Sequence, residues 1–222
     1  MEPRENSELP PLIIDGPPWE KRHEIGFFLA FVETIKAFLL HPAKTFSVMR
    51  RVARIGDALL YTVALQVFSF LWSFALGGAD PQSLLPQDPE IVELLQLPPN
   101  FARLMILIYP FSVIMLGFIS AFSFHVALKW RKEQLYNFQL VFRIFAYASG
   151  TASILMLIPG IGGLLSILLT IWITYMGIRT MYGTDAFSFT VTSILALLIA
   201  IGLYLGVAIG ITILIILLSI LI

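Results

Sequence analysis

Long apolar stretches alternate with short polar connections along the chain from residue 57 onward. A helix of about 18 or more apolar residues can cross the ~30 Å hydrocarbon core of a bilayer, and soluble domains rarely contain such a stretch. Five of them are present, at residues 58–76, 104–128, 138–159, 164–181 and 189–222. We therefore predict an all-α, polytopic membrane protein in which residues 57–222 form a five-span helical bundle.

The third stretch fits a full crossing least well. Residues 144–158 offer only ~15 uncharged positions, which is ~22 Å of helix at 1.5 Å per residue. Arg143 comes just before them and can lengthen the span by reaching back to the headgroups. The alternative interpretation is a re-entrant hairpin formed by the third and fourth stretches.

Basic residues fall almost entirely on one side of this arrangement. They precede the first span and lie in the second-to-third and fourth-to-fifth connections, whereas the opposite side has only Arg103 and an acidic first loop. The positive-inside rule makes the basic side cytoplasmic. We expect five crossings, with the N-terminus in the cytoplasm and the C-terminus outside. A hairpin entering from outside would not leave both basic connections on the cytoplasmic side.

Composition narrows the function further. Only 13% of the residues are charged, against about 25% in soluble domains. The predicted spans contain no Asp, Glu or Lys, and Arg143, Arg179 and His125 lie near their cytoplasmic ends. This disfavours ion-coupled transporters and pumps, which need ionisable groups at depth. There is no Cys, no ligand spacing among the three His and no nucleophile or phosphate-loop motif. We therefore expect no enzyme activity, catalytic residue, metal or cofactor.

The segment before the first span divides into two parts. Residues 1–24 are rich in Pro and charged residues and are predicted to form a disordered cytoplasmic tail. Residues 25–56 are predicted to form amphipathic and basic cytoplasmic helices, one over 25–40 lying flat at the interface and one over 43–54. The apolar stripe of the first helix consists of Phe27, Phe28, Phe31, Ile35, Phe38 and Leu39.

The second of these helices carries a basic face, formed by Lys44, Arg50, Arg51 and Arg54. One interpretation is that this face docks on anionic lipid headgroups. The other is that its charges only set the topology. Nucleic-acid binding is not expected, because the patch is small and tied to a membrane.

The last span contains a stripe of small residues, Gly202, Gly206 and Gly210. A GxxxG spacing lets two helix backbones approach closely, so the stripe predicts a helix-packing face. Its partner is either another span of the same chain or a second copy.

Polar uncharged residues also recur at helical spacing. Ser166, Thr170 and Thr174 share one side of the fourth span, and Gln66 lies on a polar side of the first. One interpretation is a polar groove for a lipid headgroup or small solute, as in a small permease or channel. The other is hydrogen bonding between helices, or from each hydroxyl to its own i−4 carbonyl.

Several local sequences carry a family resemblance. They are Pro42-Ala43-Lys44-Thr45-Phe46 before the first span, Ala146-Tyr147, the run Ile158-Pro159-Gly160-Ile161-Gly162-Gly163, the stretch 172–177, and Met181-Tyr182-Gly183. With the five-span layout they resemble the bacterial Yip1-domain membrane proteins over about residues 25–222.

For the bacterial members the resemblance implies the fold and the topology. We predict a protein of the prokaryotic cytoplasmic membrane that acts as a non-enzymatic scaffold or partner-binding module and organises lipids. The partners that we expect are membrane lipids and other membrane proteins or a second copy. Eukaryotic members bind prenylated Rab-type GTPases, but their Asp-Leu-Tyr-Gly-Pro-like and Gly-Tyr-x-x-x-Pro-like signatures are not intact here. Residues 55–58 and 146–150 hold the corresponding regions, and this departure argues against GTPase binding.

Overall fold

The computed structural model describes residues 16–51, 54–75, 101–130 and 137–221, and all regular elements in these ranges are helices. In chain order they are η1 (Pro18–Lys21), α1 (Arg22–Ile25), α2 (Phe27–Leu40), α3 (Pro42–Ser47), α4 (Ile55–Ala75), α6 (Phe101–Trp130), α7 (Phe138–Ala152), η3 (Ser153–Leu157), α8 (Gly162–Tyr182) and α9 (Ala186–Leu221).

Five segments are long and apolar enough to cross a membrane. They are Ile55–Ser73, Leu107–Trp130, Phe138–Leu157, Gly162–Tyr182 and Ala186–Val207. The prediction of an all-α, polytopic membrane protein is therefore confirmed.

The third span, α7 with η3, is the central helix of the bundle. It contacts α4, α6 and α8. Of its apolar stretch, 67% is buried within the chain, compared with 22% for the last span. Most of this helix contacts protein instead of lipid. Its polar side chains can therefore pair with neighbouring helices, which explains why a short uncharged stretch is sufficient for this span.

Two glycines bring the helices around α7 close together. A Cβ on Gly150 of α7 would lie 2.9 Å from the Cα of Thr62 on α4. A Cβ on Gly177 of α8 would lie 2.6 Å from a methyl group of Ile144 and 3.0 Å from the ring of Phe46. Because only glycine fits at these contacts, α4 and α8 pack directly against the backbone or side chains of α7 and α3.

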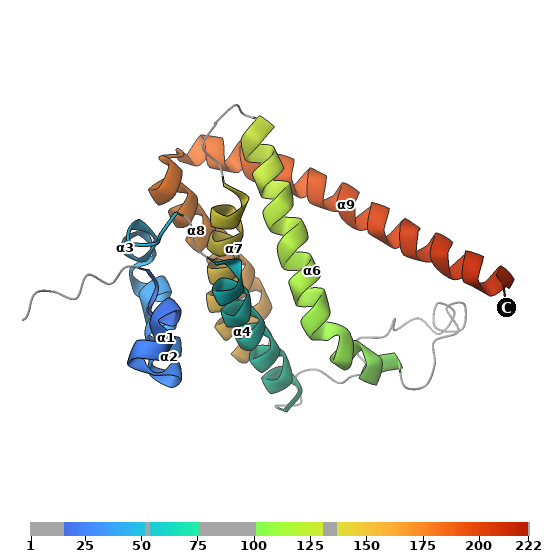
Figure 1. The fold of residues 1–222 in the computed structure, drawn as a ribbon, viewed down its shortest axis with the longest axis horizontal. Helices are drawn as coiled ribbons and strands as arrows, with labels where there is room; N and C mark the ends of the chain where they lie inside the picture. Colours follow the sequence, from blue (N-terminus) through green and yellow to red (C-terminus); the bar gives the residue numbers. More distant parts are fainter. Residues whose placement is uncertain (1–15, 52–53, 76–100, 131–136, 222) are drawn as a thin grey trace, which may run out of the picture.

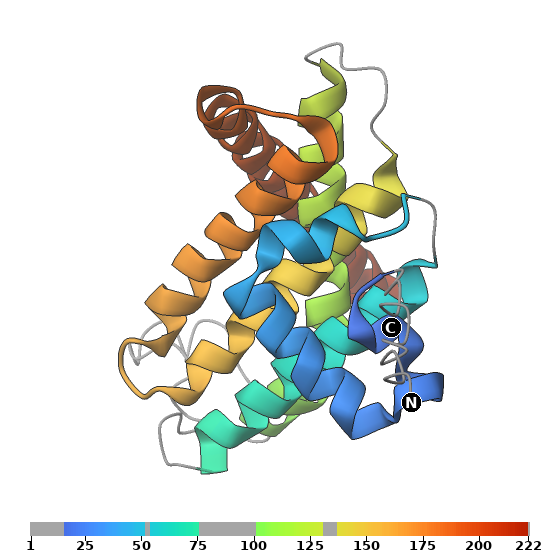
Figure 2. The ribbon, with the colours of Figure 1, turned by 90° about the vertical axis from the view of Figure 1, so that its left-hand side faces the viewer.

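The N-terminal helices lie along one face of the bundle. Figure 1 shows α1, α2 and α3 beside α4, α7 and α8, and Figure 2 shows them crossing in front of these spans. The buried positions of α2 are Ala30, Thr34 and Phe38, spaced four residues apart. In contrast, Phe27 and Phe28, which we placed on the same apolar stripe, are exposed.

Two boundaries predicted for this region are wrong. Residues 16–24 were assigned to a disordered tail, but the structure places Pro18–Ile25 in η1 and α1 and buries Trp19 completely. Residues 1–15 of that tail lie outside the described residues. The second helix, predicted over 43–54, ends at Ser47. In the first case, contacts of Trp19 and Glu20 with the bundle override the local sequence signal. In the second, the chain is no longer helical at Arg50, whose backbone carbonyl accepts a hydrogen bond from Arg143.

The last helix leaves the bundle. The first half of α9 packs on α6 through buried Ala196 and Ala200, and the helix then runs away from the other spans (Figure 1). A Cβ added to Gly202, Gly206 or Gly210 would meet nothing within 4 Å in the described part of the chain. The stripe therefore does not pack against another span within the described part of the chain. The alternative partner, a second copy, stays a prediction.

A capped turn sets the start of α9. Gly183 closes α8 with a φ of 70°, a left-handed conformation that glycine adopts without strain. The Asp185 carboxylate accepts a hydrogen bond from the Ser188 N–H at 3.1 Å. Hydrogen bonds from the Ser188 side chain and backbone hold the pKa of Asp185 below its ordinary value. This N-cap fixes where α9 begins beside α8.

The glycine contacts give a direct stability test. Gly150→Ala should lower the unfolding free energy by about 1–3 kcal/mol, because the new methyl group must displace the α4 backbone. Gly206→Ala is the matched control, since its Cβ meets no neighbour within 4 Å and gains the same helix propensity. Apparent melting temperatures of the two purified variants in detergent measure the difference. Equal melting temperatures would contradict the close approach of α4 and α7.

Candidate functional site

A buried ion pair joins the N-terminal segment to the central span. The Arg143 side chain on α7 is 0% exposed, and its guanidinium pairs with the carboxylate of Glu20 in η1, whose side chain is 11% exposed. A second guanidinium nitrogen donates to the backbone carbonyl of Arg50, and the Tyr147 hydroxyl donates to the same Glu20 oxygen at 2.9 Å. Two donors from α7 therefore converge on one carboxylate.

This geometry corrects the role expected for Arg143. We predicted that its side chain extends the third span by reaching the headgroups, but it is instead buried among protein atoms. A charged group at the edge of an apolar bundle is costly unless it is paired and hydrogen-bonded. Glu20 and the Arg50 carbonyl supply that pairing inside the fold.

Trp19 holds the same segment at a second point. Its backbone N–H donates to Thr34 Oγ1 and its indole Nε1–H to the Asp57 carbonyl, both at 2.7 Å. Arg22 forms an ion pair of 2.7 Å with the Asp57 carboxylate and lies 5.0 Å from the centre of the Trp19 ring. The segment thus bridges α2 and the start of α4.

An aromatic cluster surrounds these polar contacts. Tyr61 of α4 and Tyr147 of α7 lie with ring centroids 5.3 Å apart, and rings from the N-terminal helices pack against both. Its members are Trp19, Phe27, Phe31, Phe38, Phe46, Tyr61 and Tyr147. Ring contacts of this kind add stabilisation to the burial of the rings themselves.

Sequence reasoning missed Trp19, Glu20 and Asp57. The signal in the sequence that could have pointed to these residues is Arg143. This cation lies next to a long uncharged stretch, so it needs an acceptor if it is buried. A Trp-Glu pair preceded by two prolines in a polar tail is the complementary signal. The sequence does not connect the two, because 123 positions separate Glu20 from Arg143.

The hydroxyl groups of the spans make two kinds of hydrogen bond. Between helices, Tyr61 bonds with Thr151 at 2.9 Å and Thr62 with Ser149 at 3.2 Å. Within one helix, Thr170 donates to the carbonyl of Ser166, four residues back, at 2.8 Å. The second interpretation of the hydroxyl stripes therefore describes most of these side chains.

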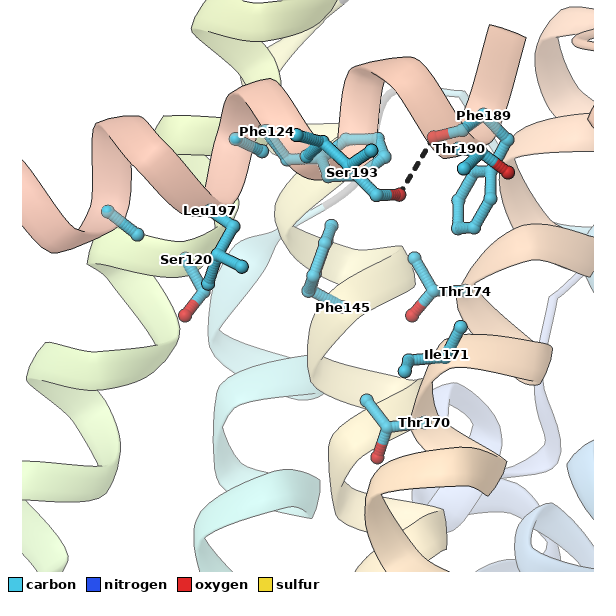
Figure 3. A pocket seen from close by; sticks show the side chains of 13 residues that line it. Ser120, Phe124, Phe145, Thr170, Ile171, Thr174, Phe189, Thr190, Ser193 and Leu197 are labelled. Atoms are coloured by element: carbon cyan, nitrogen blue, oxygen red, sulfur yellow. Dashed lines mark hydrogen bonds between the residues drawn. The ribbon is translucent and has the colours of Figure 1, made fainter. Parts of the chain in front are cut away.

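Two crevices nevertheless lie between the spans. The smaller, of about 210 Å³, is lined by Gln66, Ser149 and Thr170 among others. The larger, of about 440 Å³, is lined by Thr170 and Thr174 and opens between α8 and α9 (Figure 3). Ser120, Phe145 and Thr170 line both crevices. Of the residues proposed for a polar groove, three therefore border adjoining spaces. Ser166 is buried and serves as the acceptor of Thr170.

The predicted lipid-headgroup residues, Lys44, Arg50, Arg51 and Arg54, are exposed. They do not form one helical face, because α3 ends at Ser47. Arg50 also has a structural role that its residue type did not indicate, since its backbone carbonyl accepts the Arg143 hydrogen bond. No group of three or more His, Asp or Glu side chains comes together as a metal site among the described residues.

Comparisons with protein-family models, with curated proteins and with solved structures gave no match for this chain.

The ion pair can be tested by removing its acidic partner. Glu20→Ala leaves the Arg143 charge buried without its carboxylate, so we expect a loss of about 3–5 kcal/mol of stability. Amide hydrogen exchange of Pro18–Ser47 should rise at the same time, because the segment loses its anchor.

Two controls accompany this variant. Glu33→Ala removes an exposed pair with Lys36, whose side chains are 43% and 56% exposed, and should cost no more than about 0.5 kcal/mol. Adding Arg143→Met to Glu20→Ala should recover much of the loss, because no unpaired charge then remains. A double variant as unstable as the single one would refute the pairing argument.

Proposed function

We propose that this chain is a non-enzymatic integral membrane scaffold of the Yip1-domain type. In this proposal it resides in the cytoplasmic membrane of a prokaryote with its N-terminal helices on the cytoplasmic side. The observation that carries the proposal is the surface formed by residues 22–51 and Arg54 on the side away from the bundle, called here the outer N-terminal face.

This face is held in place by buried contacts. The Glu20–Arg143 pair and the Trp19 hydrogen bonds fix η1, while Phe38 packs on both Tyr147 and Phe46 in the core. Such contacts limit the movement of the N-terminal helices relative to the spans. A surface fixed in this way is pre-organised to bind a partner, which lowers the entropic cost of association.

The outer N-terminal face combines apolar and cationic side chains. Phe27 and Phe28 are 60% and 78% exposed, and Leu40 is 68% exposed. Lys44, Arg51 and Arg54 are exposed farther along the same segment. Exposed aromatic and aliphatic groups on a segment that also exposes Lys and Arg are typical of a surface that binds the headgroup region of anionic membranes. We infer that this face organises anionic lipids around the scaffold.

The lipid contact predicts a measurable enrichment. In nanodiscs with mixed neutral and anionic phospholipids, native mass spectrometry should detect anionic lipids retained by the wild type. The triple variant Lys44→Glu/Arg51→Glu/Arg54→Glu should reduce this retention roughly tenfold or more, because each cation near the surface contributes about 1 kcal/mol. Arg50 is left unchanged because its backbone carries the Arg143 hydrogen bond.

Single substitutions provide the control. Lys44→Glu should reduce retention, whereas Lys36→Glu should not, since Lys36 pairs with Glu33 on α2. Unchanged retention in the triple variant would restrict these cations to setting the topology.

A small permease or channel is the second candidate, and the adjoining crevices favour it. Against this function, most of the lining hydroxyls that we described donate to backbone carbonyls or to other hydroxyls, and the walls are mainly apolar. A solute path needs polar groups that remain available to the solute.

Transport can be measured in reconstituted vesicles. We expect proteoliposomes to show the same glycerol permeability as protein-free vesicles in stopped-flow light scattering. A higher permeability that Thr170→Trp abolishes would establish the permease instead, since Thr170 borders both crevices.

A further inference from the structure

The wall of the larger crevice contains a buried hydroxyl, that of Thr174, which has no hydrogen-bond partner among the described residues. Neither the scaffold proposal nor solute transport explains it. The crevice lies where α9 separates from α8, and its wall includes Phe124, Phe145 and Phe189 together with several hydroxyl groups (Figure 3). We propose that this crevice binds a neutral lipid of the diacylglycerol type, with one acyl chain against the apolar wall and an ester carbonyl bonded to Thr174.

The crevice lies at the depth of the membrane. All of its lining residues fall within the four membrane-crossing segments of α6, α7, α8 and α9. None of them is charged. An uncharged space beside the hydrocarbon core favours an uncharged ligand, because a phosphate or ammonium group would pay a large desolvation cost there.

Thr174 supplies the polar contact. Its side chain is on the crevice wall, the residue is 3% exposed, and its Oγ1 has no hydrogen-bond partner among the described residues. The hydroxyls that α9 contributes to the same wall are different, since Thr190 donates to the Ala186 carbonyl and Ser193 to the Phe189 carbonyl. A buried hydroxyl without a partner is costly, so an acceptor oxygen on a ligand would stabilise this site.

The position of Thr174 indicates which lipids can reach it. It lies eight residues before the end of α8 at Tyr182, or ~12 Å along the helix. The head of a phospholipid stays at the membrane surface, because its charges are hydrated. A lipid whose only polar groups are esters and a hydroxyl can sink deeper into the hydrocarbon core, and its carbonyl can then meet Thr174.

The size of the crevice also fits a chain better than a helix. Its volume of about 440 Å³ lies within the ~300–1,000 Å³ of ordinary ligand pockets. One turn of a helix with its side chains, ~10 Å wide and 5.4 Å high, occupies roughly 400 Å³. The crevice therefore has room for about one turn but not for a spanning helix of several turns from a second copy, whereas a flexible acyl chain fits.

Photolabelling of the full-length protein in nanodiscs tests the proposal. A diacylglycerol with a diazirine in its acyl chain should label peptides of α8 and α9 that carry Ile171, Thr174 and Leu197. A phospholipid with the same diazirine chain should label these peptides several-fold less. Unlabelled diacylglycerol should compete with the signal.

A pair of isosteric variants isolates the hydrogen bond. Thr174→Val should weaken diacylglycerol competition about 3- to 10-fold, as expected for one lost hydrogen bond. Thr190→Val is the matched control and should leave competition unchanged, because its hydroxyl is already bonded to the Ala186 carbonyl. Melting temperatures establish that both variants are folded. If Thr174→Val does not fold, Ala200→Leu, which fills the crevice, should abolish the labelling.

Several outcomes would overturn the proposal. One is equal labelling of all lipid-facing helices, which would indicate ordinary surrounding lipid only. Another is equal labelling by the phospholipid probe, which would mean that the chain alone is recognised. A third is a crosslink between the crevice and a second copy or another segment of this chain. Loss of diacylglycerol labelling would leave the scaffold proposal intact, since that proposal depends on the outer N-terminal face.

Discussion

The Arg143 guanidinium, buried beside an apolar helix, is the constraint on which the N-terminal half of the structure depends. A cation in such surroundings needs an anion and several acceptors, because hydration is no longer available to it. The Glu20 carboxylate and the Arg50 carbonyl accept hydrogen bonds from this group, and the Tyr147 hydroxyl of the same helix donates to Glu20. The position of the N-terminal helices follows from this requirement, since Glu20 can reach Arg143 only when η1 lies against α7.

The same region shows how polar and aromatic contacts cooperate in a membrane protein. Water contributes little to association inside a bilayer, so close contact and hydrogen bonding must hold the helices together. Gly150 permits the approach of α4 to α7, and the bonds Tyr61–Thr151 and Thr62–Ser149 cross that interface. The central helix is therefore the best-packed span, and its short apolar length is compatible with its protein surroundings.

The opposite side of the molecule follows different rules. α9 contacts α6 as far as Tyr204, whose hydroxyl donates to the Leu116 carbonyl at 3.5 Å, and then runs away from the bundle (Figure 1). A Cβ on any of its three glycines would meet nothing within 4 Å in the described part of the chain. Where this helix diverges, a crevice opens with one unpaired hydroxyl on its wall. We propose that the two sides serve different lipids, the outer N-terminal face binding anionic headgroups and the crevice binding an uncharged lipid.

The sequence by itself determined the helical class and the number of spans, because the length and hydropathy of each stretch are local properties. It also identified Thr170 and Thr174 as a polar pair, since their spacing of four fixes them on one side of any helix. It did not reveal that Glu20 leaves the polar tail to neutralise Arg143, that the 43–54 helix ends early, or that the α9 glycines lack a partner in the described chain. Only the tertiary structure decided these points, because each depends on which groups distant in sequence meet in space, and burial makes such meetings decisive for charged and polar atoms.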